Sequence, residues 1–451
     1  MNYQHRIASK QYQPYTIKNF DKIQQLKELR PSYLEEISVV SRVLPFRTNN
    51  YVVDELIDWD NIPNDPIFQL TFPQRQMLKW GDYEMIRNEI IKGAPETSVI
   101  RKARTVQGLM NPHPAGQLDL NVPEFNGKRL NGVQHKYNET VLFFPSQGQT
   151  CHAYCTYCFR WPQFVGLDEL KFASSDINDL IDYIEVHPEV TDVLITGGDP
   201  MFMSANILSR YIMPLITRKP GNVKTIRFGT KALAYWPYRF LTDKDSDALI
   251  SLFEKMIEND FHVSIMAHFS HYRELETRAV ELAVRRILNT GATIRCQAPL
   301  IRHINDNAAI WAKMWQQQVH LGMIPYYMFV ERNTGPKAYF GVSLANAYRI
   351  FTAAYNRVSG LCRTVRGPSM SSTPGKILIT GVTTIGHEKV FVLKFIQGRE
   401  KSWVNKVFFA SYDEHAGWID DLRPAFDKPG FFFEDRLEEI RADKIVLEDA
   451  S

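Results

Sequence analysis

Six short apolar segments alternate with amphipathic segments in the middle of the chain, and this alternation restricts the possible folds more than any other feature. The apolar segments are 141–145, 193–196, 223–228, 261–269, 294–301 and 324–330. The segments between them with helical periodicity are 176–185, 206–216, 243–258, 276–288 and 308–321. Strands that alternate with helices form a parallel sheet whose chemistry lies at the carboxyl ends of the strands. We therefore expect an α/β fold with a parallel sheet that is closed or partly closed into a barrel.

The chain of 451 residues is longer than one hydrophobic core usually fills, so several units are expected. Residues 1–134 have mostly helical periodicity, as in 22–29 and 72–93, and predict an N-terminal helical region. The six alternations occupy residues 135–342. Residues 343–451 predict a small α+β unit with a helix, a loop rich in Ser, Pro and Gly at 367–375, and strands at 377–380 and 390–395.

Charge and apolar content exclude several classes of function. The 53 basic and 50 acidic residues give a net charge of +3, which provides no general attraction for nucleic acid. No stretch approaches the roughly 18 apolar residues of a membrane helix, and the N-terminus lacks the apolar core of a signal peptide. We expect a cytoplasmic protein without a nucleic-acid or membrane partner.

Three of the five cysteines, Cys151, Cys155 and Cys158, form a CxxxCxxC cluster just after the strand predicted at 141–145. This crowding indicates metal binding rather than disulfides. Three thiolates can each bind one iron of a four-iron four-sulfur cluster and leave the fourth iron open to a small molecule. The alternatives are a structural zinc ion, which normally needs a fourth ligand at similar spacing, or unrelated buried cysteines. Cys296 and Cys362 are expected to be small buried residues.

A second motif, TGGDP at 196–200, follows the next predicted strand. Glycines at a strand end let the backbone approach a ligand, and a carboxylate can face an ammonium group. Alone, this motif would be an ordinary turn. One strand after the cysteines, it makes Gly197, Gly198 and Asp199 candidate ligand-binding residues.

Together with Tyr157, which precedes the last cysteine, these motifs resemble the radical S-adenosylmethionine superfamily. The resemblance implies a partial parallel (β/α)6 barrel in which the open iron chelates S-adenosylmethionine and Tyr157, Gly197, Gly198 and Asp199 contribute to the cofactor site. A flavodoxin- or ferredoxin-type reductant would supply one electron. Cleavage of a carbon-sulfur bond then gives a 5'-deoxyadenosyl radical that abstracts hydrogen from the substrate, while the protein orients both.

The resemblance narrows to the lysine 2,3-aminomutase family over about residues 136–398. It is carried by HKYNETVLFF, CFR, TGGDPMFMS, IRFGTKALAYWPYRF, AHFSHYRE, CQAPLIRHINDN, IPYYMFVERNTG and RGPSMSSTPGK. Family members combine pyridoxal 5'-phosphate with the adenosyl radical to move an amino group from the α to the β carbon of an amino acid. The implied function is such an isomerase. Two alternatives stay open: a pyridoxal-independent radical enzyme for another rearrangement, elimination or epimerisation, and a non-catalytic iron-sulfur protein.

The resemblance also implies residues for pyridoxal phosphate and for the substrate carboxylate. Lys136 and Thr140 take the places of two phosphate-binding arginines. Lys376, after the Ser, Pro and Gly loop, is the candidate lysine for the cofactor aldehyde, although a different alignment of the Thr-Pro pair puts Ser372 there. Arg160 matches the arginine that binds the substrate carboxylate, as its bidentate fork allows.

At the far end of the substrate, Asp306 matches one of two aspartates that hold the ammonium group of lysine, and Arg332 replaces the other. An arginine beside that ammonium would be costly, so lysine is a doubtful substrate. Either Glu331 turns inward, or Arg332 pairs with Asp306, or the substrate has an acidic or neutral polar end. The aromatic tail at 408–433 predicts core or a subunit contact, in keeping with a homo-oligomer.

Overall fold

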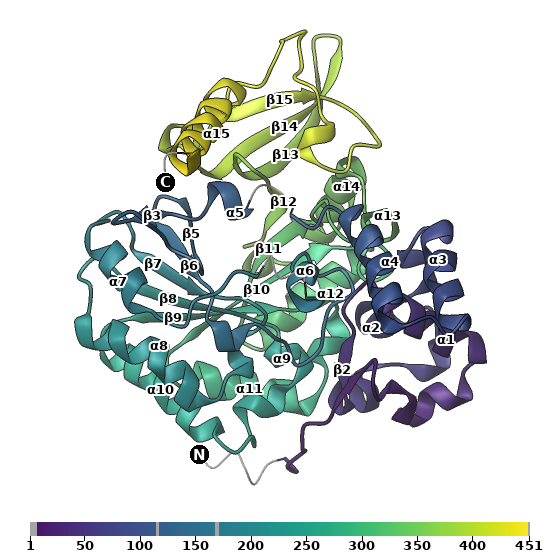
Figure 1. Ribbon diagram of the computed structural model, residues 1–451. Coiled ribbons are helices and arrows are strands. Elements are labelled where there is room, and N and C mark those ends of the chain that lie inside the picture. The colour runs from purple at the N-terminus through teal and green to yellow at the C-terminus, as the bar shows by residue number, and fades with distance from the viewer. Residues whose placement is uncertain (1–6, 114–116, 167–170, 450–451) are drawn as a thin grey trace.

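The computed structural model describes residues 7–113, 117–166 and 171–449. At its centre lies a sheet of 11 strands in the order β15-β14-β13-β12-β11-β10-β9-β8-β7-β6-β5 (Figure 1). The strands from β6 to β12 are all parallel to their neighbours. Antiparallel strands extend both edges, with β5 beside β6 and β13 to β15 beyond β12. The prediction of an α/β fold with a mostly parallel sheet is confirmed.

The six predicted strands are all present, within three residues of their expected ends. They are β6 (Thr140–Phe143), β7 (Asp192–Ile195), β8 (Thr225–Thr230), β9 (His262–His268), β10 (Thr293–Leu300) and β11 (Ile324–Val330). Buried and partly exposed positions alternate along β8 and β10, because successive side chains point to opposite faces of a sheet. Those two strands therefore have one face in the core and the other toward an open space.

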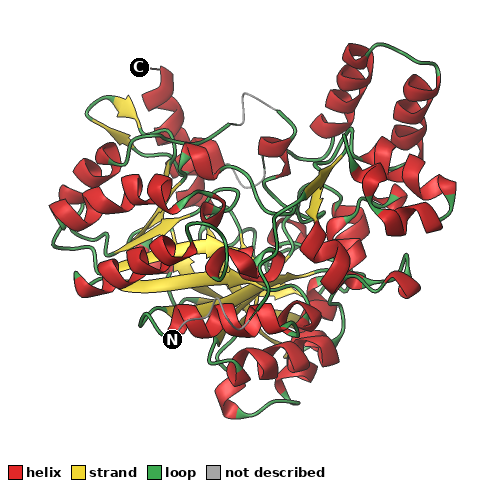
Figure 2. Ribbon diagram, turned by 90° about the horizontal axis from the view of Figure 1, so that it is seen from below, coloured by secondary structure: helices red, strands yellow, loops and turns green. Residues whose placement is uncertain are grey.

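The crossover helices are also close to their predicted positions. They are α7 (Asn178–Glu185), α8 (Ala205–Arg218), α10 (Ser246–Glu258), α11 (Arg278–Leu288) and α12 (Ala308–His320). Side-chain oxygens of Ser204, Thr277 and Asn307 accept hydrogen bonds at the starts of α8, α11 and α12, as N-cap residues do. Helices cover the sheet in the view of Figure 2, where they lie in front of the strands.

Helices α1 to α4 of the N-terminal region pack beside the sheet on the right of Figure 1, whereas α5, β3 and β5 lie on its other side. The helices of this region are α1 (Pro31–Val40), α2 (Pro66–Thr71), α3 (Trp80–Ile91), α4 (Glu96–Gly108) and α5 (Gln117–Leu120). Its strands are β1 (Pro14–Thr16), β2 (Arg47–Asn49), β3 (Glu124–Phe125), β4 (Lys128–Arg129) and β5 (Val133–Tyr137). One apolar cluster contains buried residues of this region together with buried residues of the parallel strands and their crossover helices.

Short helices occupy several connections. They are α6 (Trp161–Phe164), α9 (Ala232–Tyr235) and α13 (Lys337–Phe340).

The prediction of a loop at 367–375 is wrong for the first half of this segment, because Arg366–Ser371 form strand β12, which is parallel to β11. The small residues that suggested a loop serve close packing instead. A Cβ atom at Gly367 would lie 2.7 Å from Cβ of Met328 on β11, so glycine lets the two strands approach. The segment thus brings the following residues to the open face of the sheet.

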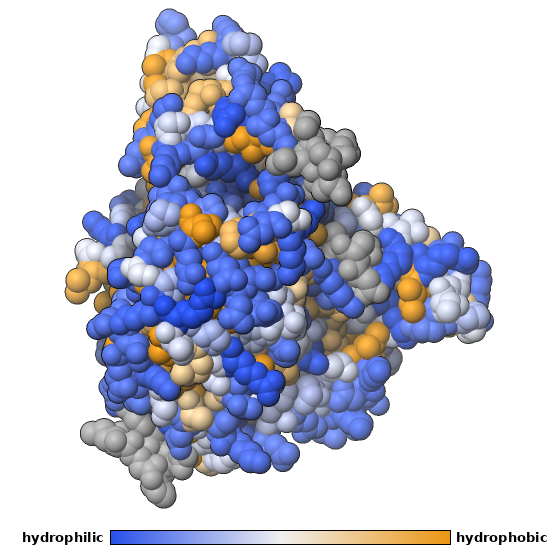
Figure 3. Space-filling view, turned by 60° about the vertical axis from the view of Figure 1, so that its left-hand side comes forward, coloured by the Kyte–Doolittle hydropathy of each residue, from blue (hydrophilic) through white to orange (hydrophobic). Residues whose placement is uncertain are grey.

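The C-terminal part consists of α14 (Leu344–Tyr355), β13 (Gly375–Ile385), β14 (Glu388–Gly398), β15 (Val407–Ser411) and α15 (Glu434–Asp449). Phe408, Phe431 and Phe433 are buried in a second apolar cluster with the strands, so this part of the aromatic tail is core. The face in Figure 3 is largely hydrophilic, with scattered apolar groups. Within the described ranges, no helix combines the length and apolarity of a membrane span.

Candidate active site

A cavity of about 360 Å³ opens at the carboxyl ends of the parallel strands, within the usual size of a small-molecule site. Its wall contains the three clustered cysteines, the segment after β7, and residues at or beyond the ends of β8, β9, β10 and β11. Lys136 on the edge strand β5 and Lys376 on β13 also line it. Eleven of the twelve residues predicted for the site thus line one cavity. They are Lys136, Cys151, Cys155, Tyr157, Cys158, Arg160, Gly197, Gly198, Asp199, Arg332 and Lys376.

The cysteine loop between β6 and α6 is held by the N-terminal region. The backbone N–H of Tyr154 donates to the carbonyl of Arg47 at 2.8 Å, and that of Thr156 to the carbonyl of Leu70 at 3.0 Å. The Asn49 amide donates to the carbonyl of His152 at 3.1 Å. A loop of this kind has no ladder partners of its own, so these bonds set where the cysteines lie.

All three cysteines are free, half-buried thiols. Burial raises the pKa of Cys158 to about 12, and it also raises the pKa of Cys151 and Cys155. Metal binding to these sulfurs must therefore release protons. Among the described residues no three His, Cys, Asp or Glu side chains converge on a point suited to a single metal ion. A cubane cluster needs no such convergence, since each thiolate binds a different iron.

The two glycines of TGGDP allow the loop after β7 to pack against the cysteine loop. A Cβ atom at Gly198 would lie 2.5 Å from the backbone nitrogen of Thr150, and one at Gly197 would lie 2.4 Å from Nε2 of Gln149. Gly197 also has a φ of +151°, which favours glycine. The N–H of Asp199 donates to the carbonyl of Thr150 at 2.8 Å. The motif therefore fixes the cysteine loop as well as lining the cavity.

The Asp199 carboxylate joins β7 to the end of β8. It accepts hydrogen bonds from the Thr230 hydroxyl at 2.6 Å and from the backbone N–H of Lys231 at 2.9 Å. Burial raises its pKa to about 6, although these donors favour the charged form. Asp199 is thus a rigid carboxylate in the cavity wall.

A polar network below the cysteines was missed by sequence reasoning. The Tyr157 hydroxyl lies 2.9 Å from both Nε2 of His268 and Oγ of Ser270. The ammonium of Lys231 forms a buried ion pair with Glu274 at 2.7 Å. His268 is the last residue of β9, and Lys231 directly follows β8. Since catalytic groups gather at the carboxyl ends of parallel strands, both residues could have been predicted from the sequence.

Two arginines face the cavity and have no carboxylate partner among the described residues. Arg160 and Arg332 both lie over the ring of Phe159, with their Cζ atoms 5.3 and 4.2 Å from its centroid. Burial lowers the pKa of each to about 10, and repulsion from Arg332 contributes at Arg160. Nη1 of Arg332 is buried without a hydrogen-bond partner among the described residues. This wall of the cavity is suited to anionic groups.

Two lysines extend this cationic wall. Lys376 donates to the Gln397 amide oxygen at 2.8 Å and lies 4.3 Å above the Tyr327 ring, and burial lowers its pKa to about 7. Lys136 donates to the carbonyl of Ser372, and burial holds its pKa well below the usual value. Both lysines are thus less charged at neutral pH than an exposed lysine.

Other residues considered from the sequence lie elsewhere or are engaged. Asp306 is exposed and lies outside the cavity wall, whereas the Arg332 guanidinium donates to the Ser371 hydroxyl at 3.4 Å. The Thr140 hydroxyl donates to the Asp192 carboxylate at 3.1 Å. Ser372 is fully buried, and its hydroxyl donates to the carbonyl of Gly375. Glu331 lines the cavity, its oxygens have no partner among the described residues, and burial raises its pKa.

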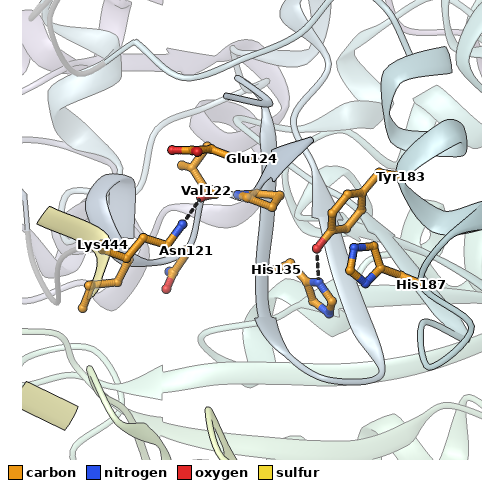
Figure 4. Close-up of a pocket in the computed structure, with 9 residues that line it drawn as sticks. Asn121, Val122, Glu124, His135, Tyr183, His187 and Lys444 are labelled. Atoms are coloured by element: carbon orange, nitrogen blue, oxygen red, sulfur yellow. Dashed lines mark hydrogen bonds between the residues drawn. The ribbon is translucent and has the colours of Figure 1, made fainter. Parts of the chain in front are cut away.

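A second cavity, of about 350 Å³, lies beside β5 and α7 (Figure 4). There Nδ1 of His135 lies 2.7 Å from the Tyr183 hydroxyl, and His187 packs beside Tyr183. Lys444 donates to the carbonyl of Val122 at 3.1 Å. None of the predicted site residues lines this cavity, so the chemistry is assigned to the first one.

Comparison with known proteins relates the chain to aminomutases. No family model matches it. It is 29% identical over 398 residues to an Aquifex aeolicus (strain VF5) protein provisionally named L-lysine 2,3-aminomutase, which covers 88% of this chain and 92% of the relative. L-lysine 2,3-aminomutase of Clostridium subterminale is 25% identical, covering 66% and 68%. Glutamate 2,3-aminomutase of Clostridioides difficile (strain 630) is 28% identical, covering 47% of each chain.

Among solved structures, a radical SAM methyltransferase from Sphaerobacter thermophilus matches with a TM-score of 0.37 and 16% identity, covering 52% of this chain and 68% of that one. This likeness is too distant to carry an argument. The sequence relatives confirm the resemblance that the motifs indicated.

Proposed function

We infer that the chain belongs to the lysine 2,3-aminomutase-like family of radical S-adenosylmethionine enzymes, and we propose that it moves an amino group between adjacent carbons of an amino acid. One observation carries the proposal. Lys376 is far along the sequence from the cysteine triad and Arg160, yet all of these residues line a single cavity. The three-part division at 134 and 342, with a partial (β/α)6 barrel in the middle, is part of this proposal.

The cavity fits the groups that this chemistry needs. Cys151, Cys155 and Cys158 would hold a four-iron four-sulfur cluster, and Tyr157, Gly197, Gly198 and Asp199 would line the site of S-adenosylmethionine. Lys136 and Lys376 would bind pyridoxal phosphate, Lys136 through its phosphate. When bound, these cofactors supply an adenosyl radical for hydrogen abstraction, an aldehyde for the amino group and a ring that delocalises the unpaired electron.

The protein's own groups bind and orient the substrate. Arg160 lines the cavity two residues after Cys158, and its guanidinium, which has no carboxylate partner among the described residues, could bind a substrate carboxylate as a bidentate pair. Lys376 has a pKa of about 7, so a large fraction of its amine is neutral and nucleophilic near neutral pH. Lys376 lines the cavity, whereas Ser372 is fully buried outside its wall, and this supports the alignment that places the cofactor lysine at Lys376.

The charges of the cavity disfavour lysine as the substrate. Arg332 lines the cavity, whereas Asp306 does not. Glu331 also lines it, but burial raises the pKa of this carboxyl and so favours its neutral form. The side-chain ammonium group of a lysine substrate would therefore lie near the buried guanidinium of Arg332, whose Nη1 has no hydrogen-bond partner among the described residues. An amino acid with an acidic or neutral polar end agrees better with this wall.

The test is an anaerobic assay of the reconstituted enzyme against all free amino acids, with and without pyridoxal phosphate, followed by mass spectrometry of the products. The proposal predicts a β-amino acid that forms only when pyridoxal phosphate is present. Absence of isomerised products with a loaded cluster would exclude it.

A second candidate is a radical enzyme that does not use pyridoxal phosphate. It is favoured by one observation: the Thr140 hydroxyl is engaged with Asp192, which leaves Lys136 as the only predicted cradle residue available to a phosphate. In that case, deuterium from labelled substrate would enter 5'-deoxyadenosine without added pyridoxal phosphate. Strict dependence on the added cofactor would exclude this candidate.

A flavodoxin- or ferredoxin-type reductant, a homo-oligomeric assembly and a cytoplasmic location are further proposals from the sequence. They are tested by reduction assays with each electron donor, by light scattering and by cell fractionation.

A further inference from the structure

The tyrosine at the end of α9 lies against the cysteine triad. Tyr235 is almost fully buried, and its hydroxyl oxygen is 3.2 Å from Sγ of Cys155. Hydrogen bonds that involve sulfur are longer than those between nitrogen and oxygen, and this distance suits one. In the cluster-bound protein the thiolate has no proton, so the hydroxyl must be the donor.

The position of Tyr235 is fixed from both sides. Its N–H donates to the carbonyl of Lys231 at 2.9 Å, and its carbonyl accepts a hydrogen bond from the Asn49 amide at 3.0 Å. The same amide donates to His152 in the cysteine loop at 3.1 Å. Asn49 therefore ties the backbone of Tyr235 to the loop that carries Cys155.

The ring of Tyr235 is held by a cation. The Lys231 ammonium lies 4.7 Å from the ring centroid and is paired with the fully buried Glu274 at 2.7 Å. A buried cation over a tyrosine ring is an attractive contact that restricts ring motion. Because Glu274 balances the charge, the contact mainly orients the hydroxyl toward Cys155.

A hydrogen bond to a cluster sulfur affects the two oxidation states differently. Adding an electron makes the sulfur ligands more negative, and a donor stabilises the more negative state more strongly. Donors at the sulfurs therefore raise the reduction potential of an iron-sulfur cluster.

We propose that Tyr235 is a positioning residue that raises the reduction potential of the cluster by donating its hydroxyl hydrogen bond to Cys155, with Lys231 orienting the ring. This inference rests on the proposed function, since it requires a cluster at Cys151, Cys155 and Cys158. It makes the cluster easier to reduce by a weak biological electron donor.

The test compares wild type with Tyr235→Phe, both with reconstituted clusters of equal iron and sulfide content, in redox titrations followed by electron paramagnetic resonance without S-adenosylmethionine. Tyr51→Phe is the matched control. It removes a buried hydroxyl that contacts Thr277 at 2.7 Å, and its ring packs against Trp236, the neighbour of Tyr235. The variant Tyr235→Phe should be about tenfold harder to reduce, a shift of about 59 mV to more negative potential for one electron, while Tyr51→Phe keeps the wild-type value.

An unchanged midpoint in Tyr235→Phe overturns the inference, and so does an equal shift in both variants. If Tyr235→Phe assembles no cluster, resonance Raman spectra of the wild type decide. A shift of the iron-cysteine stretching bands on deuterium exchange supports the hydrogen bond, and no shift refutes it. Failure of the wild type itself to bind a cluster would instead contradict the proposed function.

Discussion

Lys376 provides a sharp prediction, because its burial makes it chemically different from an ordinary lysine. With a pKa of about 7 its amine is neutral in a fraction of about 0.1 at pH 6, 0.5 at pH 7 and 0.9 at pH 8. An exposed lysine is neutral in about 0.0003 of molecules at pH 7, so the neutral, nucleophilic fraction of Lys376 is roughly a thousandfold larger there.

The assay is borohydride trapping of pyridoxal phosphate on the protein between pH 5.5 and 9.5, read by peptide mass spectrometry. The reduced adduct should lie on Lys376, reach half of its maximum near pH 7 and level off above pH 8. Lys376→Ala should lose it. Lys136→Ala is the control, since Lys136 lines the same cavity and is assigned only to the phosphate.

Two results would refute this reasoning. One is an adduct on Lys136 or another lysine in the wild type. The other is trapping that keeps rising to pH 9.5, which would mean that Lys376 has the pKa of an exposed lysine.

The remaining predictions concern the cysteine loop, the substrate and stability. Gly198→Ala should lose bound iron while its circular dichroism stays near wild type, because the new Cβ would lie 2.5 Å from the nitrogen of Thr150; full iron content would contradict this. Arg160→Met should raise KM for the amino acid about 10- to 100-fold, from the loss of a hydrogen-bonded charge of about 1.5–3 kcal/mol; an unchanged KM would remove Arg160 from the substrate site. Between pH 7 and 9 the unfolded chain keeps a proton on Lys376 that the folded protein releases, so stability rises with pH there. Lys376→Met should lower that rise by about 2 kcal/mol in urea unfolding, and an unaltered rise would contradict the lowered pKa.

Much of the fold follows from local patterns in the sequence. Strand β11 has the bounds expected for 324–330, because a run of apolar and aromatic residues between a glycine-containing turn and a charged pair leaves little choice. The extended segment 366–371 was not recognisable as a strand. Its small residues, such as Gly367, allow close contact with β11. The sequence alone does not show which strand this segment pairs with.

Those parts of the candidate site whose residues lie close together in the sequence could be predicted. The triad and TGGDP each lie in one loop, so their sequence already specifies their chemistry. Tyr235 was missed because it reaches Cys155 from the helix after another strand, 80 residues later in the chain, and Lys231 was missed with it because it acts through the Tyr235 ring. Asp306 shows the converse, since its motif predicted a place in the site but its loop keeps it exposed.

The central claim is that Cys151, Cys155 and Cys158 hold a cluster that cleaves S-adenosylmethionine, and anaerobic turnover with a strong reductant tests it most directly. The wild type should bind about four irons per chain and form 5'-deoxyadenosine, while Cys155→Ser should lose both. A fully loaded wild-type cluster that leaves S-adenosylmethionine intact under reduction would contradict the account.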